Sequence, residues 1–317
     1  METKQMYVAN INVVFGKNCE PLINRADDII IPALTSGICR EATQKTKFIF
    51  KDARLYEIEN DEFVIQGIII KDTILDVMSE FTPDGELEKT NKHIPSAPYS
   101  VFLIYLRNHR MVLVKNQNGS PDMRSFTSTF REVIKKYIRN NNAKNRDNKD
   151  KLLPFPSINV AGIKTRQSIK ETLKDVSKIN ELTLKLYPLN DEWDFDPIFG
   201  GLSNQVRKMI GSKNGKVVYT SPESKDGVAD LIEATGGYVK AEMKVTYNSD
   251  LSYSGTKKTG KIKDDEISEV MNIDLESELD SAYDEIHGYK KDIPVLSKTT
   301  KNQIVDYEKF LTKRKKN

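Results

Sequence analysis

The sequence predicts an α+β protein with two domains, each built on a mostly antiparallel sheet with packed helices, and with further helices at the C-terminal end. Short β-rich runs recur in both halves of the chain, and segments with apolar residues at helical spacing lie between them. The length of 317 residues fits two domains of ordinary size. We place an N-terminal α+β domain at residues 1–143, a basic, proline-containing connector at 144–156, and a C-terminal α+β domain with a helical end at 157–317.

The N-terminal half contains most of the strand patterns. Strands are predicted at residues 7–15, 48–58, 63–70, 99–106 and 111–114. Only Arg107-Asn-His-Arg110 separates the last two, which predicts a tight antiparallel connection. Residues 22–34 and 126–138 carry apolar side chains at helical spacing, and Ser120 or Asp122 is available to cap the second helix.

The C-terminal half alternates between strand and helix patterns. Strands are predicted at residues 157–163, 182–187, 216–220 and 238–247. Thr165 is a candidate N-cap for a helix whose apolar face includes Leu173, Val176 and Ile179. Further helices are predicted at residues 202–210, at 222–235, across an acidic stretch from 267 to 286, and around 304–311. Residues 249–263 are rich in glycine, serine and lysine and are predicted to form a mobile loop.

Composition and charge limit the class of protein. The chain is 38% hydrophobic and 30% charged, with a net charge of only +3, so any binding to a polyanion must come from local patches. Cys19 and Cys39 are the two cysteines, the start of the chain has no leader pattern, and the longest apolar runs have the length of strands. We therefore expect a cytoplasmic protein with no disulfide framework and no direct membrane insertion.

Motifs for cofactors and metals are weak. The glycine-bearing segments 198–202 and 211–216 lack the spacing and the Lys-Ser/Thr ending of a phosphate-binding loop. The three histidines, His93, His109 and His287, do not pair at metal-ligand spacing. We expect no bound cofactor and no resident metal.

Basic residues form the main candidate site. The most informative segment, residues 131–151, combines lysines and arginines, which neutralise phosphates, with asparagines that can donate to phosphate oxygens or base edges. A second cluster lies in the predicted loop before residue 264, and a third, residues 313–316, is more simply a solubilising tail. The predicted nucleic-acid-binding residues are Lys135, Lys136, Arg139, Lys144, Arg146, Lys149, Lys151, Lys257, Lys258, Lys261 and Lys263.

One catalytic alternative stays open. Asp230, followed by Glu242-Met-Lys244 on a predicted strand, resembles the acidic residue and Glu-x-Lys arrangement of Mg²⁺-dependent nucleases. In such enzymes carboxylates hold the metal and the lysine orients the attacking water. The same alternation of charged and apolar residues is also typical of a half-buried strand with a solvated face.

A second alternative is a protein-interaction adaptor. The predicted acidic helix from 267 to 286 carries an apolar face with Leu275 and Leu279, which could bind a partner protein or a second copy of the chain. A symmetric dimer would double each basic patch along a duplex.

Several segments in the C-terminal two thirds follow one another in a known order. They are the hairpin from Pro98 to Arg110, the helix pattern at 125–138, the strand Leu182-Thr-Leu-Lys-Leu-Tyr-Pro188, the strand Ala241-Glu-Met-Lys-Val-Thr-Tyr247 with a Gly-Lys loop after it, and a helix containing Tyr283. This order resembles RexA-like phage-exclusion proteins and, more loosely, KwaB-type defence proteins. The resemblance has no diagnostic motif, does not cover the chain before about Pro95, and transfers no site residue.

What the resemblance implies is a cytoplasmic homodimer that binds DNA with little sequence preference in bacterial antiviral defence and acts through a separate effector. Our main hypothesis is therefore a non-enzymatic, sequence-nonspecific nucleic-acid-binding protein, with DNA expected rather than RNA.

Overall fold

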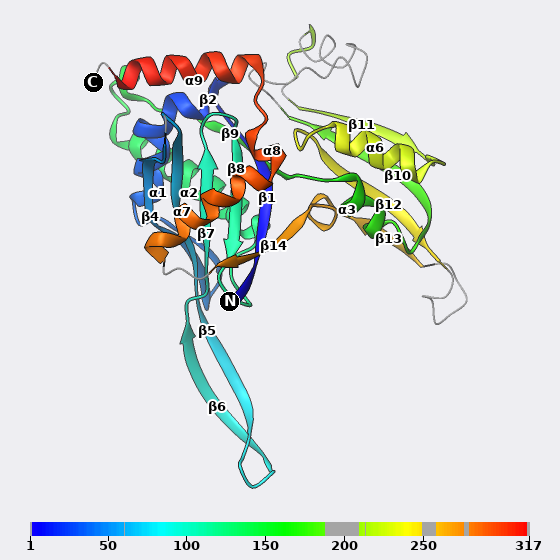
Figure 1. The fold of residues 1–317 in the computed structure, drawn as a ribbon. Helices are drawn as coiled ribbons and strands as arrows, with labels where there is room; N and C mark the ends of the chain where they lie inside the picture. Colours follow the sequence, from blue (N-terminus) through cyan, green and yellow to red (C-terminus); the bar gives the residue numbers. More distant parts are fainter. Residues whose placement is uncertain are drawn as a thin grey trace.

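The computed structural model describes residues 2–59, 61–187, 209–212, 214–248, 258–275 and 279–315 (Figure 1). The fold is α+β, as predicted, with a large sheet A and a smaller sheet B. Every strand pairing in both sheets is antiparallel among the described residues. No helix in the described ranges is long and apolar enough to cross a membrane, and Cys19 and Cys39 are free thiols.

Sheet A runs in the order β14-β1-β8-β7-β5-β4-β3, while β2 and β9 pair with β1 and β6 pairs with β5. Its strands are β1 (Glu2–Phe15), β2 (Glu20–Pro21), β3 (Cys39–Thr43), β4 (Thr46–Glu57), β5 (Phe63–Phe81), β6 (Leu87–Ser96), β7 (Tyr99–Tyr105), β8 (Arg110–Lys115), β9 (Pro156–Gly162) and β14 (Val270–Leu275). The central strands are apolar on both sides, because helices cover both faces of the sheet.

One face of sheet A packs against η1 (Leu22–Arg25), η2 (Ala26–Ile30), α1 (Ile31–Thr35), α2 (Met123–Lys144) and α9 (Lys301–Arg314). Helix α2 begins where predicted, because the Asp122 carboxylate accepts a hydrogen bond from the Ser125 amide at 2.7 Å. Its Phe126 packs edge-on against Phe50, with ring centroids 5.6 Å apart. The opposite face is covered by α7 (Leu279–Gly288), η6 (Tyr289–Asp292) and α8 (Pro294–Ser297).

Sheet B has the order β11-β10-β12-β13, with β10 (Val176–Leu186), β11 (Gly215–Thr220), β12 (Lys240–Tyr247) and β13 (Thr259–Ile262). Helices α3 (Arg166–Thr172) and α6 (Lys225–Ala234) cover one face, where Leu184 and Met243 pack against Ile232. Thr165 caps α3 as predicted, since its hydroxyl accepts a hydrogen bond from the Ser168 amide. The other face of sheet B carries polar side chains.

Three sequence-based predictions of local structure were wrong. The helix that starts after Thr165 ends at Thr172, and Val176 and Ile179 belong to strand β10, where their β-branched side chains enter the core of sheet B. Residues 270–275 form strand β14 rather than an acidic helix, because Ile273 and Leu275 alternate into the core as β14 pairs with β1. The end of the predicted mobile loop is strand β13, which pairs with β12; residues 249–257 and 202–208 lie outside the described residues.

Sheet A contains strands from both sides of the domain boundary expected at residues 144–156. Strands β9 and β14, both beyond that boundary, pair with β1 in sheet A, and helices α7, α8 and α9 pack on the same sheet. Sheet B with α3 and α6 is therefore an insertion between β9 and β14, and it lies to one side of the larger body (Figure 1).

A long two-stranded ribbon extends away from the body (Figure 1). Strand β5 pairs with β7 only as far as Ile70 and with β4 as far as Thr73; beyond that point, up to Phe81, it pairs with β6 alone. This strand was predicted to end at residue 70, and the ribbon was not predicted. Its exposed apolar side chains are Ile74, Leu75, Met78, Phe81, Leu87 and Ile94, which are 43–74% exposed.

Candidate polyanion-binding surface

The predicted basic segment, residues 131–151, is mostly helical, and we call its seven predicted binding residues the connector cations. Lys135, Lys136, Arg139 and Lys144 belong to α2, which is longer than predicted, while Arg146 follows it and Lys149 and Lys151 lie in η3 (Lys149–Lys151). Within the described ranges, none of these seven side chains forms an ion pair with a carboxylate. Their charges are therefore available to an external anion.

The asparagines of this segment have a different role from the predicted one. The Asn142 side-chain oxygen accepts a hydrogen bond from the Leu153 amide at 2.8 Å, and its nitrogen donates to the Leu153 carbonyl at 2.9 Å. Asn141 donates to the Lys151 carbonyl at 3.3 Å. These bonds fold the connector back onto the end of α2, so both asparagines hold the backbone that presents the cations.

A stripe of cations runs along α2. Arg124, Arg131, Lys135 and Arg139 are spaced by seven, four and four residues, which places them on one side of the helix. Arg131 donates a hydrogen bond to the Ile158 carbonyl at 3.1 Å, so its guanidinium is directed toward β9 and the junction with sheet B.

The face of sheet B opposite α3 and α6 carries a second group of cations that the sequence analysis did not combine. Strand pairing places Lys185 directly opposite Lys216 on one side and Lys240 on the other. These three lysines form a row across three adjacent strands, roughly 10 Å long at the usual spacing of strands. Lys244 of β12 likewise lies directly opposite Lys261 of β13. In each strand, charged residues alternate with apolar ones, and this alternation is visible in the sequence. Only the pairing register of the strands shows that the lysines of different strands lie side by side.

Two carboxylates on this face are already neutralised. Glu242 bonds to Lys185 and, at 2.6 Å, to Lys261, while Glu181 bonds to Lys244 at 3.0 Å. Burial acts to raise the pKa of Glu242, but the hydrogen bonds from the two lysines outweigh it, and the net result is a lowered pKa. We define the basic surface as the α2 stripe, the connector cations and the five lysines of this sheet face.

The four predicted loop residues differ in where they lie. Lys261 belongs to the basic surface, and Lys258 is exposed just before β13. The Lys263 backbone amide donates to the Glu266 side chain at 2.6 Å, where the chain enters η5 (Asp264–Glu266). Lys257 lies outside the described residues.

The predicted nuclease residues are not brought together. Asp230 lies on α6, where it pairs with Arg166 at 2.8 Å. Because α6 packs against the face formed by Ala241 and Met243, Glu242 and Lys244 project from the opposite face of the sheet. Among the residues that the structure describes, no group of three or more His, Cys, Asp or Glu side chains is placed to hold a metal ion.

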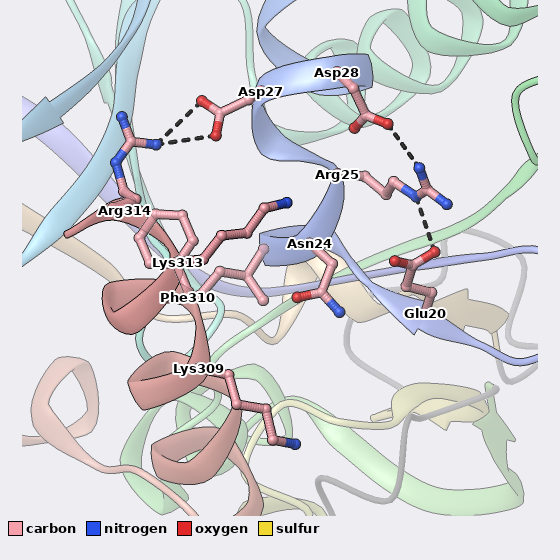
Figure 2. Close-up of a pocket in the computed structure, with 10 residues that line it drawn as sticks. Glu20, Asn24, Arg25, Asp27, Asp28, Lys309, Phe310, Lys313 and Arg314 are labelled. Atoms are coloured by element: carbon pink, nitrogen blue, oxygen red, sulfur yellow. Dashed lines mark hydrogen bonds and ion pairs between the residues drawn. The ribbon is translucent and has the colours of Figure 1, made fainter. Parts of the chain in front are cut away.

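Two residues of the basic C-terminal run, 313–316, form ion pairs within the protein. Arg314 donates to both oxygens of Asp27, at 3.0 and 3.2 Å, and Lys315 pairs with Asp61 at 2.7 Å. Figure 2 shows this region, a pocket of about 720 Å³ in which Arg25 also lies between Glu20 and Asp28. Since most of its charges are paired, this pocket is a weaker candidate for binding a polyanion.

Leu275, one of the two residues named for the adaptor face, does not lie on an exposed helix but belongs to strand β14. Leu275 is only 7% exposed and packs in the core beneath α7, and the side chain of Leu279 lies outside the described residues.

Comparison with known proteins adds no assignment. No protein-family model matches the chain, and no curated protein has a significantly similar sequence.

Proposed function

We propose that the protein binds nucleic acid, DNA in particular, without sequence specificity through the basic surface. The observation that carries this proposal is the set of connector cations that have no carboxylate partner in the described ranges and lie on the same helix as Arg131 or directly after it. Arg131 in turn acts electrostatically on Lys240, the end of the lysine row of sheet B. Two clusters that are distant in the sequence therefore adjoin.

The chemistry of this surface fits backbone contacts rather than base readout. Lysines and arginines spread over helix, turn and sheet neutralise phosphates but carry little sequence information. The α2 stripe from Arg124 to Arg139 spans about 22 Å at the helical rise per residue, long enough to follow several phosphates of a duplex.

The biological setting in this proposal comes from the resemblance to phage-exclusion proteins. In that setting the protein is a cytoplasmic sensor of bacterial antiviral defence that acts through a separate effector protein. Nucleic-acid binding can be tested without this setting, so the two parts of the proposal stand or fall separately.

A matched pair of triple variants tests the binding surface. Lys135, Lys136 and Arg139 are replaced by glutamine in one variant, and the control replaces Lys89, Lys291 and Lys301, which are exposed on the ribbon, η6 and α9. Binding to two unrelated DNA duplexes is measured over a salt series. We expect the first variant to bind both duplexes more weakly, with the slope of log K against log salt smaller by about 0.9 for each phosphate that is no longer neutralised.

Four outcomes would contradict the proposal. Equal losses in both variants would mean that only net charge matters, and unchanged binding would remove α2 from the site. Equal binding of a duplex RNA of the same sequence would contradict the preference for DNA. Cleavage that appears only with Mg²⁺ in the same gels and is lost in Glu242→Gln would restore the nuclease alternative.

We also propose that two copies of the chain associate through the ribbon. Leu75 lies opposite Ile94, and Phe81 lies opposite Leu87, so four large apolar side chains occupy one face of it. A two-stranded hairpin is marginally stable alone in water, and an exposed apolar patch of this kind marks a protein interface.

The charges of the ribbon do not suit a polyanion as its occupant. Asp76 pairs with Lys45 and His93, each at 2.6 Å, and Glu80 pairs with Lys92 at 2.5 Å, while Asp84, Glu86 and Glu88 form no ion pair within the described residues. The ribbon has no excess of positive charge for a polyanion, whereas its apolar face is complementary to itself across a two-fold axis. The mass of the protein in solution tests this second proposal.

A further inference from the structure

A pocket of about 360 Å³ lies where the two sheets meet, between α2, β9, β12 and η5. Its walls combine the aromatic ring of Tyr7 with the apolar side chains of Met123 and Val160 and the hydroxyl of Ser268. The volume is at the lower end of the range for small-molecule sites, roughly 300–1,000 Å³. One wall requires glycine at position 162, because a Cβ there would meet the Ser268 hydroxyl oxygen at 1.9 Å.

The carboxylates that line the pocket already have partners. Asp265 pairs with Arg124 at 2.5 Å, and Asp264 pairs with Lys164 at 2.8 Å and accepts a hydrogen bond from the Ala241 amide at 2.8 Å. Asp122 caps α2. Asp264 and Asp265 therefore each have a cation of their own, whereas Asp122 is held by a backbone amide.

Two cations remain in the pocket after these pairs are formed. Arg131 hydrogen-bonds to a backbone carbonyl, which is neutral. Lys240 has no carboxylate within ion-pair distance in the described part of the chain. Burial lowers the pKa of Lys240; the Asp264 carboxylate opposes this shift, while Arg131, Lys164 and Lys185 add to it.

A half-buried lysine beside other cations is costly to hold, because its charge has lost water without gaining a partner. An anion placed between Lys240 and Arg131 would remove this cost. A phosphomonoester carries a charge of about −1.5 to −2 at neutral pH, which matches the two cations.

We propose that this pocket binds a phosphomonoester, with Lys240 and Arg131 as the groups that contact the phosphate. The ligand has the size of a phosphorylated sugar or a mononucleotide, and its non-phosphate part lies against Tyr7, Met123 and Val160. The same chemistry is present in a free small molecule and at the phosphorylated 5′ end of a nucleic-acid strand. The site does not depend on duplex binding by the basic surface, since its cations converge on one small cavity.

Calorimetric titration of the full chain with inorganic phosphate and with adenosine monophosphate tests this assignment. We expect binding in the wild type and at least tenfold weaker binding in Lys240→Gln and in Arg131→Gln. Lys178→Gln is the control, because Lys178 is exposed in the same sheet and does not line the pocket. Lys240→Arg keeps the charge and is expected to retain part of the affinity, which separates the effect of the missing charge from a failure to fold.

A second arm distinguishes the source of the phosphate. A short single-stranded DNA is titrated with and without its 5′ phosphate, alongside adenosine monophosphate. Tighter binding of the phosphorylated strand than of the mononucleotide would identify a strand end, and the reverse would identify a free small molecule. The proposal is overturned if neither phosphate nor the phosphorylated probes bind, if Lys240→Gln and Arg131→Gln bind as the wild type does, or if the 5′ phosphate makes no difference and both strands lose affinity equally in Lys240→Gln.

Discussion

At the scale of single residues, the ion pair between Lys164 and Asp264 connects the two sheets. The Lys164 side chain is 1% exposed and that of Asp264 12%. Lys164 also donates to the Gly162 carbonyl at the end of β9, and Asp264 accepts from the Ala241 amide of β12. The pair therefore ties the last residues of a sheet A strand to the edge of the phosphate pocket.

Removing both partners of this pair is expected to cost less than the sum of the two single removals. Asp264→Asn keeps an acceptor for the Ala241 amide but leaves a buried ammonium without a counter-charge, so we expect it to lower the free energy of unfolding by about 3 kcal/mol. Lys164→Met should have a similar effect, and the double variant should lose less than the sum of the two. Urea denaturation measures all three, and additive losses would contradict a coupled buried pair.

At the scale of elements, helix α9 closes one end of the larger body. Tyr307 donates to the Asp61 carbonyl at 2.6 Å and accepts a hydrogen bond from the Phe63 amide at 2.8 Å, so one hydroxyl ties the helix to the start of β5. Phe310 packs against Phe63, and Arg314 lies over both rings. The C-terminal helix thus stabilises the strand from which the ribbon extends.

The buried Tyr307 hydroxyl should make the stability of the protein depend on pH in the alkaline range. Burial raises the pKa of Tyr307 to about 12, while tyrosine in the unfolded chain titrates near 10. The folded protein therefore keeps a proton that the unfolded chain loses, and stability should fall as pH rises from 10 to 12. We expect Tyr307→Phe to cost about 1–3 kcal/mol at neutral pH and to reduce this alkaline loss.

Thermal unfolding of both proteins across this pH range provides the measurement. Burial also raises the pKa of Tyr105, so part of the alkaline loss should persist in the variant. An identical slope of stability against pH in the two proteins would show that Tyr307 is not responsible.

At the scale of the whole molecule, the insertion of sheet B between β9 and β14 creates the basic surface. The cations of α2 come from a helix of sheet A, and the lysine row comes from the inserted sheet. The ribbon projects away from the larger body (Figure 1). Nucleic-acid binding and self-association are therefore assigned to separate parts of the protein and can be disrupted independently.

Self-association predicts a concentration-dependent mass above the 36.1 kDa of one chain. Phe81→Ser combined with Leu87→Ser removes the apolar pair near the ribbon tip and should shift the protein to monomer, as measured by sedimentation equilibrium. The control, Leu152→Ser with Val305→Ser, removes two exposed apolar side chains elsewhere and should leave the mass unchanged. A monomeric wild type whose ribbon captures a different protein would identify an effector as the occupant instead.

The sequence by itself determined the α+β class, most of the strands, and the helices with clear caps such as Asp122 and Thr165. These features depend on local periodicity and on side chains that bond to their own backbone, which a short window of sequence contains. The same local reasoning assigned Val176, Ile179 and Ile273 to helices, because in isolation their spacing fits either structure and only pairing with a neighbouring strand decides it.

The candidate site was only partly visible in the sequence. The cations of residues 131–151 could be found as a charge cluster, but Lys185, Lys216 and Lys240 lie up to 109 positions beyond Arg131 and looked like ordinary surface charge. Strand register joined the three lysines, the pocket between α2 and β12 brought Lys240 near Arg131, and the intervening sheet separated Asp230 from Glu242. Tertiary structure decided these points because a binding surface depends on distances between residues far apart in the chain, which local sequence patterns do not contain.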